Sequence, residues 1–332
     1  MKQDFNYKVC TRCFTFNHAP YIRDTMDGFT IQQTNFSFAC VVVDDNSTDG
    51  EQEVIRKYLA ENFKTPYRTE ETDDFNLICA DHNNNPNCTF IVFLLKYNHY
   101  SIKKSKFPYF SEWFDNAKYH ALCEGDDHWI DENKLQMQVN LLESNNDVVA
   151  CGGGYKSIRN CTKISESCIK KLNQPYFVFD INEWSDGWLL KTLTVMYRQS
   201  AWQEYLKVAD KYKYARDIHL FYHLMKQGKG IYISHILGAY NIHEGSACST
   251  VPKAQNALYG YQCNRELWEF NQDEVTRRRL LKSINSRLVN KMPKQNTFGL
   301  FKEGIVLSKT LKELSHLVYH FLFGKTALLF KS

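Results

Sequence analysis

The chain has 332 residues, a formal net charge of +4 and 43% hydrophobic residues. This length allows one large domain with an appendage, and the content of charged and aromatic residues excludes a disordered or collagen-like chain. No apolar run reaches the roughly 18 residues of a membrane-spanning helix, and residues 1–5 lack the apolar core of a secretory signal. We therefore expect a cytoplasmic protein with a core large enough for an enzyme.

Cysteine usage points to a reducing compartment. The 11 cysteines are odd in number and lack paired spacing, and several lie in apolar, strand-like runs. The one CxxC pair, Cys10 and Cys13, has no second ligand pair at a spacing that suits zinc. Strand alternation places these two side chains on opposite faces. We expect structural cysteines here rather than a metal or redox site.

In chain order, the first 150 residues alternate between strand-like and helix-like patterns. The predicted elements are a strand at 8–14, a helix at 20–33, a strand at 38–43, a helix at 48–62, strands at 89–95 and 119–123, and a helix through 135–142. Thr48 and Glu51 have the spacing of a capping box at the start of the second helix. This alternation predicts an α/β fold with a mostly parallel sheet flanked by helices.

Two long connections interrupt this pattern. Residues 81–87 are rich in Asn and predict a loop. Residues 97–115 are basic and aromatic, which is typical of either a flap over a site or a solvated loop. Further along, the predicted elements are a strand at 192–198, a helix at 217–227 and strands at 231–234 and 236–242.

The last part of the chain differs in charge. Residues 277–332 contain twelve Lys or Arg and two Glu, a net charge of +10, so the preceding residues carry −6. Apolar stretches at 317–323 and 327–330 accompany the cations, and the pattern predicts basic amphipathic helices. Two interpretations stay open: the helices lie on an anionic membrane face, or they pack on the main domain or form a dimer contact.

Two acidic clusters follow predicted strands: Asp44-Asp45, and the EGDD segment at 124–127. Ligands of open α/β sheets bind outside the carboxyl ends of the strands, so both clusters are expected at one rim. Crowded carboxylates repel one another unless a cation lies between them, and oxygen ligands favour Mg²⁺ or Mn²⁺. The residues thus predict a metal–diphosphate site, and the alternative for either cluster alone is a helix N-cap.

At these residues the sequence resembles the family 2 glycosyltransferases of the GT-A fold. The segments that carry the resemblance are TFNHAPYI at 15–22, VVVDDNSTDG at 41–50 and CEGDDHWIDENKLQMQVNLLE at 123–143, with weaker matches RDIHL at 216–220 and YNIHEG at 240–245. The residues of these motifs are most similar to those of transferases encoded in bacterial capsule or cell-surface polysaccharide clusters. The resemblance covers about residues 5–250. It implies a GT-A domain at 1–250, with a nucleotide-sugar half at 1–150 and an acceptor half at 151–250, before a basic helical region at 251–332.

The resemblance implies roles for individual positions. The nucleotide-binding residues would be Thr15, Phe16, Asn17, Asp44, Asp45, Glu124 and Asp126. Asp126 would also bind the metal, with His243 as a further ligand facing the diphosphate, and Asp217 would be the general base. Asp127 would orient the site. Independently of the resemblance, Trp188 is expected to support the acceptor side, because aromatic rings pack on sugar faces.

The sequence departs from the family pattern at several of these places. Phe14 stands where the family often has Pro, Glu124 replaces Asp, Arg216 replaces Gly and Asn241 replaces Arg. Alternatives therefore stay open: Asp217 as a carboxylate that stabilises a helix start, and His243 as an ordinary histidine. The aromatic candidates either line an acceptor pocket or pack in the core, and they are Trp184, Trp188 and Tyr197.

The implied activity is inverting, metal-dependent transfer of a sugar from a nucleotide donor, a UDP-sugar in the first instance. Its acceptor would be a hydroxyl of a glycan or lipid-linked oligosaccharide, its cofactor Mn²⁺ or Mg²⁺, and its further partners an anionic membrane surface or a second copy of the chain. A non-catalytic glycan- or nucleotide-binding protein of the same fold is the alternative. A second alternative is a sugar nucleotidyltransferase, although the Gly-rich, basic phosphate-binding loop of such an enzyme does not follow the first predicted strand. Nucleic-acid binding is not expected, because the basic residues gather in the tail.

Overall fold

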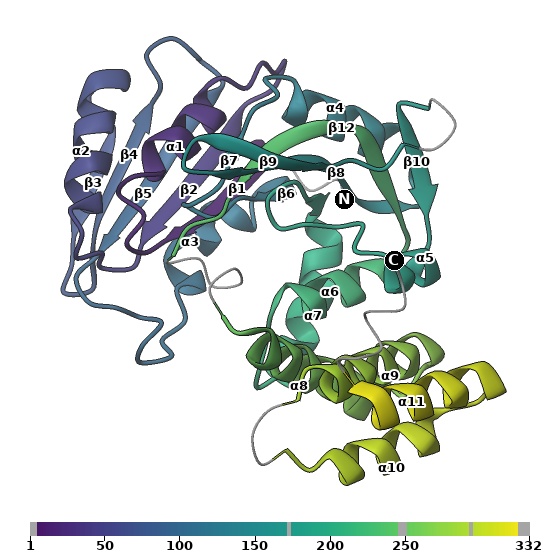
Figure 1. Ribbon diagram of the computed structural model, residues 1–332. Coiled ribbons are helices and arrows are strands. Elements are labelled where there is room, and N and C mark those ends of the chain that lie inside the picture. Colours follow the sequence, from purple (N-terminus) through teal and green to yellow (C-terminus); the bar gives the residue numbers. More distant parts are fainter. Residues whose placement is uncertain (1–4, 171–173, 245–250, 292–294, 325–332) are drawn as a thin grey trace.

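A computed structural model describes residues 5–170, 174–244, 251–291 and 295–324. Figure 1 shows a twisted sheet with helices around it and, below the sheet, a group of helices from the last part of the described chain. The strands are β1 (Tyr7–Thr15), β2 (Phe38–Asp44), β3 (Arg68–Glu71), β4 (Phe75–Asp81), β5 (Cys88–Leu95), β6 (Ala117–Leu122), β7 (His128–Trp129), β8 (Val148–Arg159), β9 (Thr162–Ser167), β10 (Tyr176–Phe179), β11 (Met196–Arg198) and β12 (Lys229–Asn241). The helices are α1 (Ile22–Thr30), α2 (Glu51–Asn62), α3 (Phe107–Phe114), α4 (Lys134–Ser144), α5 (Ile181–Asp186), α6 (Gln199–Ala209), α7 (Asp217–Met225), α8 (Lys253–Asn271), α9 (Glu274–Val289), α10 (Thr297–Leu307) and α11 (Leu311–Phe323).

The centre of the sheet is parallel and buried. β1 lies between β2 and β6, β5 follows β2, and all three pairings are parallel. Every residue of β2 and β5 is buried, as expected for strands covered on both faces. Thr15 stands opposite Asp44 in the register of β1 and β2, so the ends of these strands meet at one rim. The predicted fold class, an α/β sheet flanked by helices, is confirmed.

The outer strands differ more from the expectation. The strand expected at 192–198 is only the three-residue β11, and the two strands expected within 231–242 form the single strand β12. A register shift between Ile233 and Ile236, where β12 pairs with β8, explains the apparent break in the sequence pattern. The edge strands β3 and β9 are exposed throughout, so they lack the apolar run by which a strand is predicted.

Two apolar cores cover the two faces of the sheet. Residues of α3, α6 and α7 pack on one face, and residues of α1, α2 and α4 pack on the other. Cys10 lies in the first core and Cys13 in the second, which confirms that the CxxC pair points to opposite faces. All cysteines in the described part of the chain are free thiols.

The predicted capping box of the second helix is wrong. α2 begins at Glu51, its N-cap is Gly50 in the left-handed region (φ 90°), and no side chain caps it. The backbone N–H of Thr48 instead donates to the Asn17 side chain at 2.8 Å. Glu51 is fully buried and turned away from the helix start towards the end of β1, where it enters the site described below.

The C-terminal helices α8 to α11 pack on the main body through α5 and α7. Arg279 of α9 lies over the ring of Trp184 at 4.4 Å, and Lys282 pairs with Asp186 at 2.9 Å. These contacts favour the interpretation in which the basic helices pack on the domain, for α9 at least. Among the described helices, none combines the length and apolarity that a membrane span requires. The expected apolar stretch at 327–330 and the boundary near residue 250 lie outside the described residues.

Candidate active site

The loop after β6 is pinned against the end of β1. The backbone N–H of Gly125 donates to the carbonyl of Phe14 at 2.9 Å, and Thr25 of α1 donates to the carbonyl of Asp127 at 2.7 Å. A Cβ on Gly125 would lie 2.1 Å from Thr15 Oγ1, so only glycine permits this approach. The acidic EGDD segment is thereby held at the rim of the sheet, as its position after a strand predicts.

Three possible metal ligands converge at this rim. Asp126, His243 and His18 each offer one ligand atom, and these atoms lie within 4.8 Å of one another. Asp126 Oδ2 is 3.1 Å from His243 Nε2 and 3.9 Å from His18 Nε2. The ring of Tyr21 packs on His243, and the side-chain amide of Asn241 donates to the Asp126 carbonyl at 2.7 Å. The structure thus brings together Asp126 and His243 from distant parts of the sequence.

His18 was not among the residues singled out in the sequence, although it lies inside the TFNHAPYI segment. Its Nδ1 is 3.2 Å from Thr15 Oγ1, and that hydroxyl donates to the carboxylate of Glu51. Glu51 also accepts from the backbone N–H of His18 and from Ser47 Oγ, both at 2.8 Å. This chain of contacts turns Nδ1 of His18 towards Thr15 and leaves Nε2 facing Asp126.

Burial changes the pKa values of Glu51 and His18. Burial raises the pKa of Glu51 to about 7, against which its hydrogen bonds with Thr15, His18 and Ser47 act. Burial also lowers the pKa of His18, although the nearby charge of Asp126 opposes that effect. A neutral imidazole is the form of histidine that binds a metal ion. The environment therefore favours the ligand form of His18.

The two flanking acids of the EGDD segment have different surroundings. Asp127 is buried and accepts from the backbone N–H of Asn241 at 3.0 Å, which ties the loop to the end of β12. Burial, reinforced by the charge of Asp126, raises the pKa of Asp127. Glu124 lies 3.6 Å from Arg12 across the rim, and its pKa is also raised by burial.

Asp44 and Asp45 follow β2 but face different partners. Both oxygens of Asp45 are used by the next loop, because they accept from the backbone N–H groups of His99 and Tyr100 and pair with Lys106 at 2.6 Å. Asp45 therefore anchors the basic segment that the sequence marked as a flap or a solvated loop. Asp44 Oδ1 accepts from Gln52, whereas its buried Oδ2 has no hydrogen-bond partner within the described residues.

The other predicted nucleotide residues also lie at this rim. Thr15 is buried, and Phe16 next to it is 41% exposed. Asn17 adopts a positive φ of 58°, and its side chain accepts from Thr48, so it shapes the loop between β1 and α1. The end of β1 is thus held by contacts to the start of α2.

A cavity of about 410 Å³ lies between the acidic rim and side chains from residues 155–240. Its lining residues are Glu124, Asp126, Asp127, Tyr155, Trp188, Lys191, Thr192, Leu193, Asp217 and Tyr240. Asp217 is the first residue of α7, and burial raises its pKa. Trp188 is 37% exposed in this cavity, whereas Trp184 and Tyr197 are fully buried in the core. Tyr155 and Lys191 carried no signal in the sequence that marked them, whereas Tyr240 opens the YNIHEG segment.

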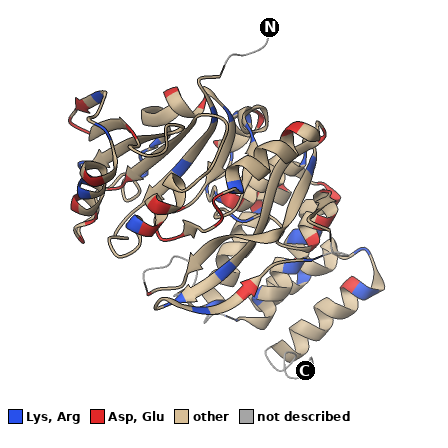
Figure 2. Cartoon of the chain, turned by 90° about the horizontal axis from the view of Figure 1, so that it is seen from above, with Lys and Arg blue, Asp and Glu red and all other residues tan. Residues whose placement is uncertain are grey.

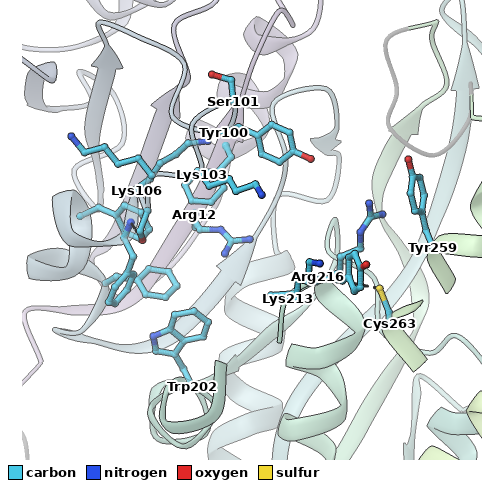
Figure 3. Close-up of a pocket in the computed structure, with 18 of the residues that line it drawn as sticks. Arg12, Tyr100, Ser101, Lys103, Lys106, Trp202, Lys213, Arg216, Tyr259 and Cys263 are labelled. Carbon is cyan, nitrogen blue, oxygen red and sulfur yellow. Dashed lines mark hydrogen bonds between the residues drawn. The ribbon is translucent and has the colours of Figure 1, made fainter. Parts of the chain in front are cut away.

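A larger basic cleft of about 950 Å³ adjoins this cavity. Figure 3 shows Tyr100, Ser101 and Lys103 on one side of it and Arg216 and Tyr259 on the other. The described residues that line it include six Lys or Arg and no carboxylate. Two links connect the cavities: Arg12 of the cleft lies near Glu124, and Arg216 directly precedes Asp217.

The fold of the chain is similar to that of solved structures. TarS of S. aureus, residues 1–349 in complex with UDP-GlcNAc, superposes with a TM-score of 0.54 at 16% identity, covering 94% of this chain and 79% of that one. The full TarS structure gives a TM-score of 0.52 at 14% identity, covering 98% of this chain and 49% of that one. The chain has the GT-A fold.

Sequence comparison matches a smaller part of the chain. Residues 14–76 match the model of the family described as glycosyl transferase family 2. Uncharacterized proteins of Mycobacterium tuberculosis and Mycobacterium bovis are 29% identical over 137 residues, which cover 41% of this chain. The match spans about a third (32%) of the length of these relatives. The matched family segment contains the β1 and β2 ends that build the rim.

Proposed function

We propose that the chain is a family 2 glycosyltransferase that moves a sugar from a nucleotide donor to a hydroxyl acceptor. The observation that carries this proposal is the 410 Å³ cavity, in which Asp217 shares one space with Glu124 and Asp126. Asp217 lies about 90 positions after the two acids in the sequence, so only the fold brings it close to them. The GT-A fold and the family match over 14–76 support the same conclusion.

The donor set of Asp126, His18 and His243 fits a divalent cation. Two imidazoles beside one carboxylate suit Mn²⁺ better than Mg²⁺, which prefers oxygen ligands. When bound there, the cation supplies positive charge that stabilises the departing diphosphate. Thr15 and Glu51 orient His18 for this role, and Asn241 holds the backbone of Asp126.

The proton is handled on the other side of the cavity. Asp217 receives the proton of the acceptor hydroxyl as that oxygen attacks the anomeric carbon. Partial burial raises the pKa of Asp217, which makes its carboxylate a stronger base at neutral pH. A single base on the acceptor side, with no covalent enzyme intermediate, leads to inversion at the anomeric carbon. The exposed face of Trp188 offers a packing surface for a sugar ring.

The nucleoside end of the donor is assigned to the rim between β1 and β2. The buried, unpaired Oδ2 of Asp44 is an acceptor for an N–H of a base such as uracil. Phe16, which follows the partner of Asp44 in the β1–β2 register, is partly exposed, and Lys106 lies 5.0 Å from the ring centre of Phe14. UDP-sugars are therefore the first donors to test. The proposed acceptor is a glycan or lipid-linked oligosaccharide of a cell-surface polysaccharide.

A thermal-shift screen of nucleotide sugars with and without Mn²⁺ tests the donor, followed by transfer and donor-hydrolysis assays. We expect stabilisation by one nucleotide class that requires Mn²⁺ and is lost in Asp126→Ala. Binding that is the same in Asp126→Ala, with Mn²⁺ present, contradicts the metal assignment. Nucleotide binding without hydrolysis or transfer identifies the non-catalytic binding protein instead.

A further inference from the structure

The last two described helices leave large apolar side chains uncovered. The exposed ones are Phe298 (58%), Ile305 (44%) and Val306 (84%) on α10 and Leu311 (87%), Leu322 (62%) and Phe323 (54%) on α11. Phe298, Lys302 and Ile305 are spaced four and three residues apart, which places them along one side of α10. The opposite sides of both helices carry Leu300, Leu307 and Leu317, which are buried in the helical core.

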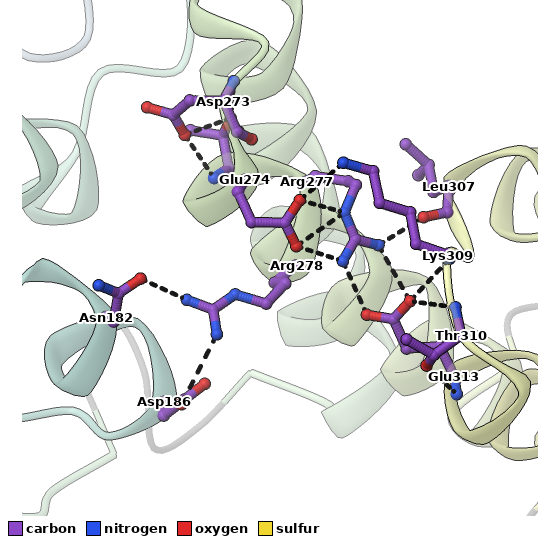
Figure 4. A network of polar contacts seen from close by, with 11 residues as sticks. Asn182, Asp186, Asp273, Glu274, Arg277, Arg278, Leu307, Lys309, Thr310 and Glu313 are labelled. Atoms are coloured by element: carbon purple, nitrogen blue, oxygen red, sulfur yellow. Dashed lines mark hydrogen bonds and ion pairs between the residues drawn. The ribbon is translucent and has the colours of Figure 1, made fainter.

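The acidic side chains of these helices are used inside the protein. Glu303 accepts from the hydroxyl of Tyr261 at 2.7 Å, and Glu313 pairs with Arg277 at 2.8 Å. Figure 4 shows the second contact as part of a network in which Arg277 lies between Glu274 and Glu313. Both glutamates of α10 and α11 thus bind side chains of neighbouring helices. Lysines of the two helices remain exposed to solvent.

Three of the five cations of α9 are buried, and the other two, Arg278 and Lys282, pair with Asp186 of α5. Arg277, Arg279 and Arg287 are all less than 10% exposed. By contrast, Lys302 of α10 and Lys312 of α11 are exposed, and Lys302 lies 4.7 Å from the ring centre of Phe298. In the sequence of α11 the only Lys, Arg, Asp or Glu residues are Lys312 and Glu313 near its start, and Figure 2 shows that the helix leading to the C-terminus is otherwise free of these residue types. Lys302 and Lys312 thus add positive charge to the outer surface of α10 and α11.

We infer that this outer surface docks on a membrane that contains anionic phospholipid. The α10–α11 face is defined as Phe298, Lys302, Ile305, Val306, Leu311 and Lys312. Its apolar side chains enter the interfacial layer, and its lysines pair with lipid phosphates. The charges favour an anionic membrane as the occupant. The face combines apolar side chains with positively charged lysines, and the neighbouring carboxylates pair with residues of other helices. The inference concerns location and does not depend on the proposed catalytic activity.

Vesicle sedimentation of the full chain tests this inference. Vesicles of phosphatidylcholine alone are compared with vesicles that also contain phosphatidylglycerol. The wild-type chain is expected to sediment with the anionic vesicles only. A double variant, Val306→Asp with Leu311→Asp, and a second one, Lys302→Glu with Lys312→Glu, are each expected to lower the partition at least about tenfold.

Matched substitutions elsewhere provide the controls. Ile164→Asp on β9, where the side chain is 51% exposed, and Lys57→Glu on α2 are expected to sediment like wild type. Circular dichroism and thermal unfolding show whether each variant keeps its fold, and at least one of the two double variants must do so. Wild-type chain that stays in the supernatant, or folded double variants that sediment like wild type, overturn the inference. Self-association lost in the double variants, seen by analytical ultracentrifugation without vesicle binding, assigns the face to a second copy instead.

Discussion

The acidic rim of the sheet and the C-terminal helices differ in how their charged side chains are arranged. At the rim, Glu124, Asp126 and Asp127 crowd together, and Arg12 is 3.6 Å away from one of them. In the helices, Arg277 lies between two glutamates at hydrogen-bond distance. Paired opposite charges need no further ligand, whereas crowded like charges are costly unless something cationic joins them. The comparison separates a region built to bind from a region built to pack.

The largest expected effect concerns the base of the proposed reaction. Asp217→Asn keeps the shape of the cavity but removes proton acceptance, so turnover should fall roughly 10³-fold. Donor affinity should change little, because the proposed role of Asp217 is towards the acceptor hydroxyl and not towards the donor. Steady-state transfer and calorimetric donor titration measure the two quantities. Asp210→Asn, exposed at the end of α6, is the control, and wild-type turnover in Asp217→Asn would remove this residue as the base.

Breaking the paired region should affect stability rather than chemistry. Arg277→Met leaves Glu274 and Glu313 close together without their shared cation, and we expect a loss of roughly 2–4 kcal/mol in the free energy of unfolding. Urea unfolding measures the loss. The matched control is Lys207→Met, which breaks an exposed pair with Glu204 and should cost less than about 0.5 kcal/mol. Equal effects of the two variants would contradict the distinction drawn between them.

A smaller effect is expected one contact away from the proposed metal. Thr15→Val removes the hydroxyl that links His18 to Glu51, and the affinity for Mn²⁺ should fall about 10- to 100-fold. Direct Mn²⁺ titration, followed by electron paramagnetic resonance, reads this out without any activity assay. Thr69→Val, exposed on β3, serves as the control. An unchanged Mn²⁺ affinity in Thr15→Val would leave His18 outside the site.

The smallest effect is a slope in the pH dependence of stability. Burial raises the pKa of Glu51 from 4.5 to about 7 in the folded chain, so the folded state binds more protons than the unfolded state between these values. The free energy of unfolding should therefore fall by about 1 kcal/mol per pH unit as the pH rises from about 5 to about 7. Glu51→Gln cannot ionise and should flatten this part of the curve in urea unfolding at a series of pH values. A slope that Glu51→Gln does not change would mean that other groups cause it.

The parallel centre of the fold could be predicted because its signals are local. The β2 and β5 runs are continuously apolar, and the acidic clusters follow strand ends, so their common rim follows from parallel topology. The outer strands could not be predicted in the same way. β9 is exposed throughout, and the glycines of β8 at 152–154 weaken the apolar pattern of that strand.

The candidate site divides along the same line. Asp126, Asp217 and His243 could be predicted from the sequence, because each lies in a segment that resembles a family motif. His18 and Glu51 were missed, the latter because its spacing from Thr48 is that of a capping box. Asp44 and Asp45 are adjacent and equivalent in the sequence, yet only the structure shows that the loop at 98–106 uses both oxygens of Asp45.

By itself, the sequence determined the α/β class, the acidic rim and the change of charge from body to tail, because periodicity and composition are properties of neighbouring residues. Tertiary structure decided which charges are already satisfied. Arg277 and Glu313 are 36 residues apart and pair in a partly buried contact, whereas Asp126 and His243 are 117 apart and meet with a third possible ligand. Both pairs depend on how distant segments pack, and no local pattern encodes that distance.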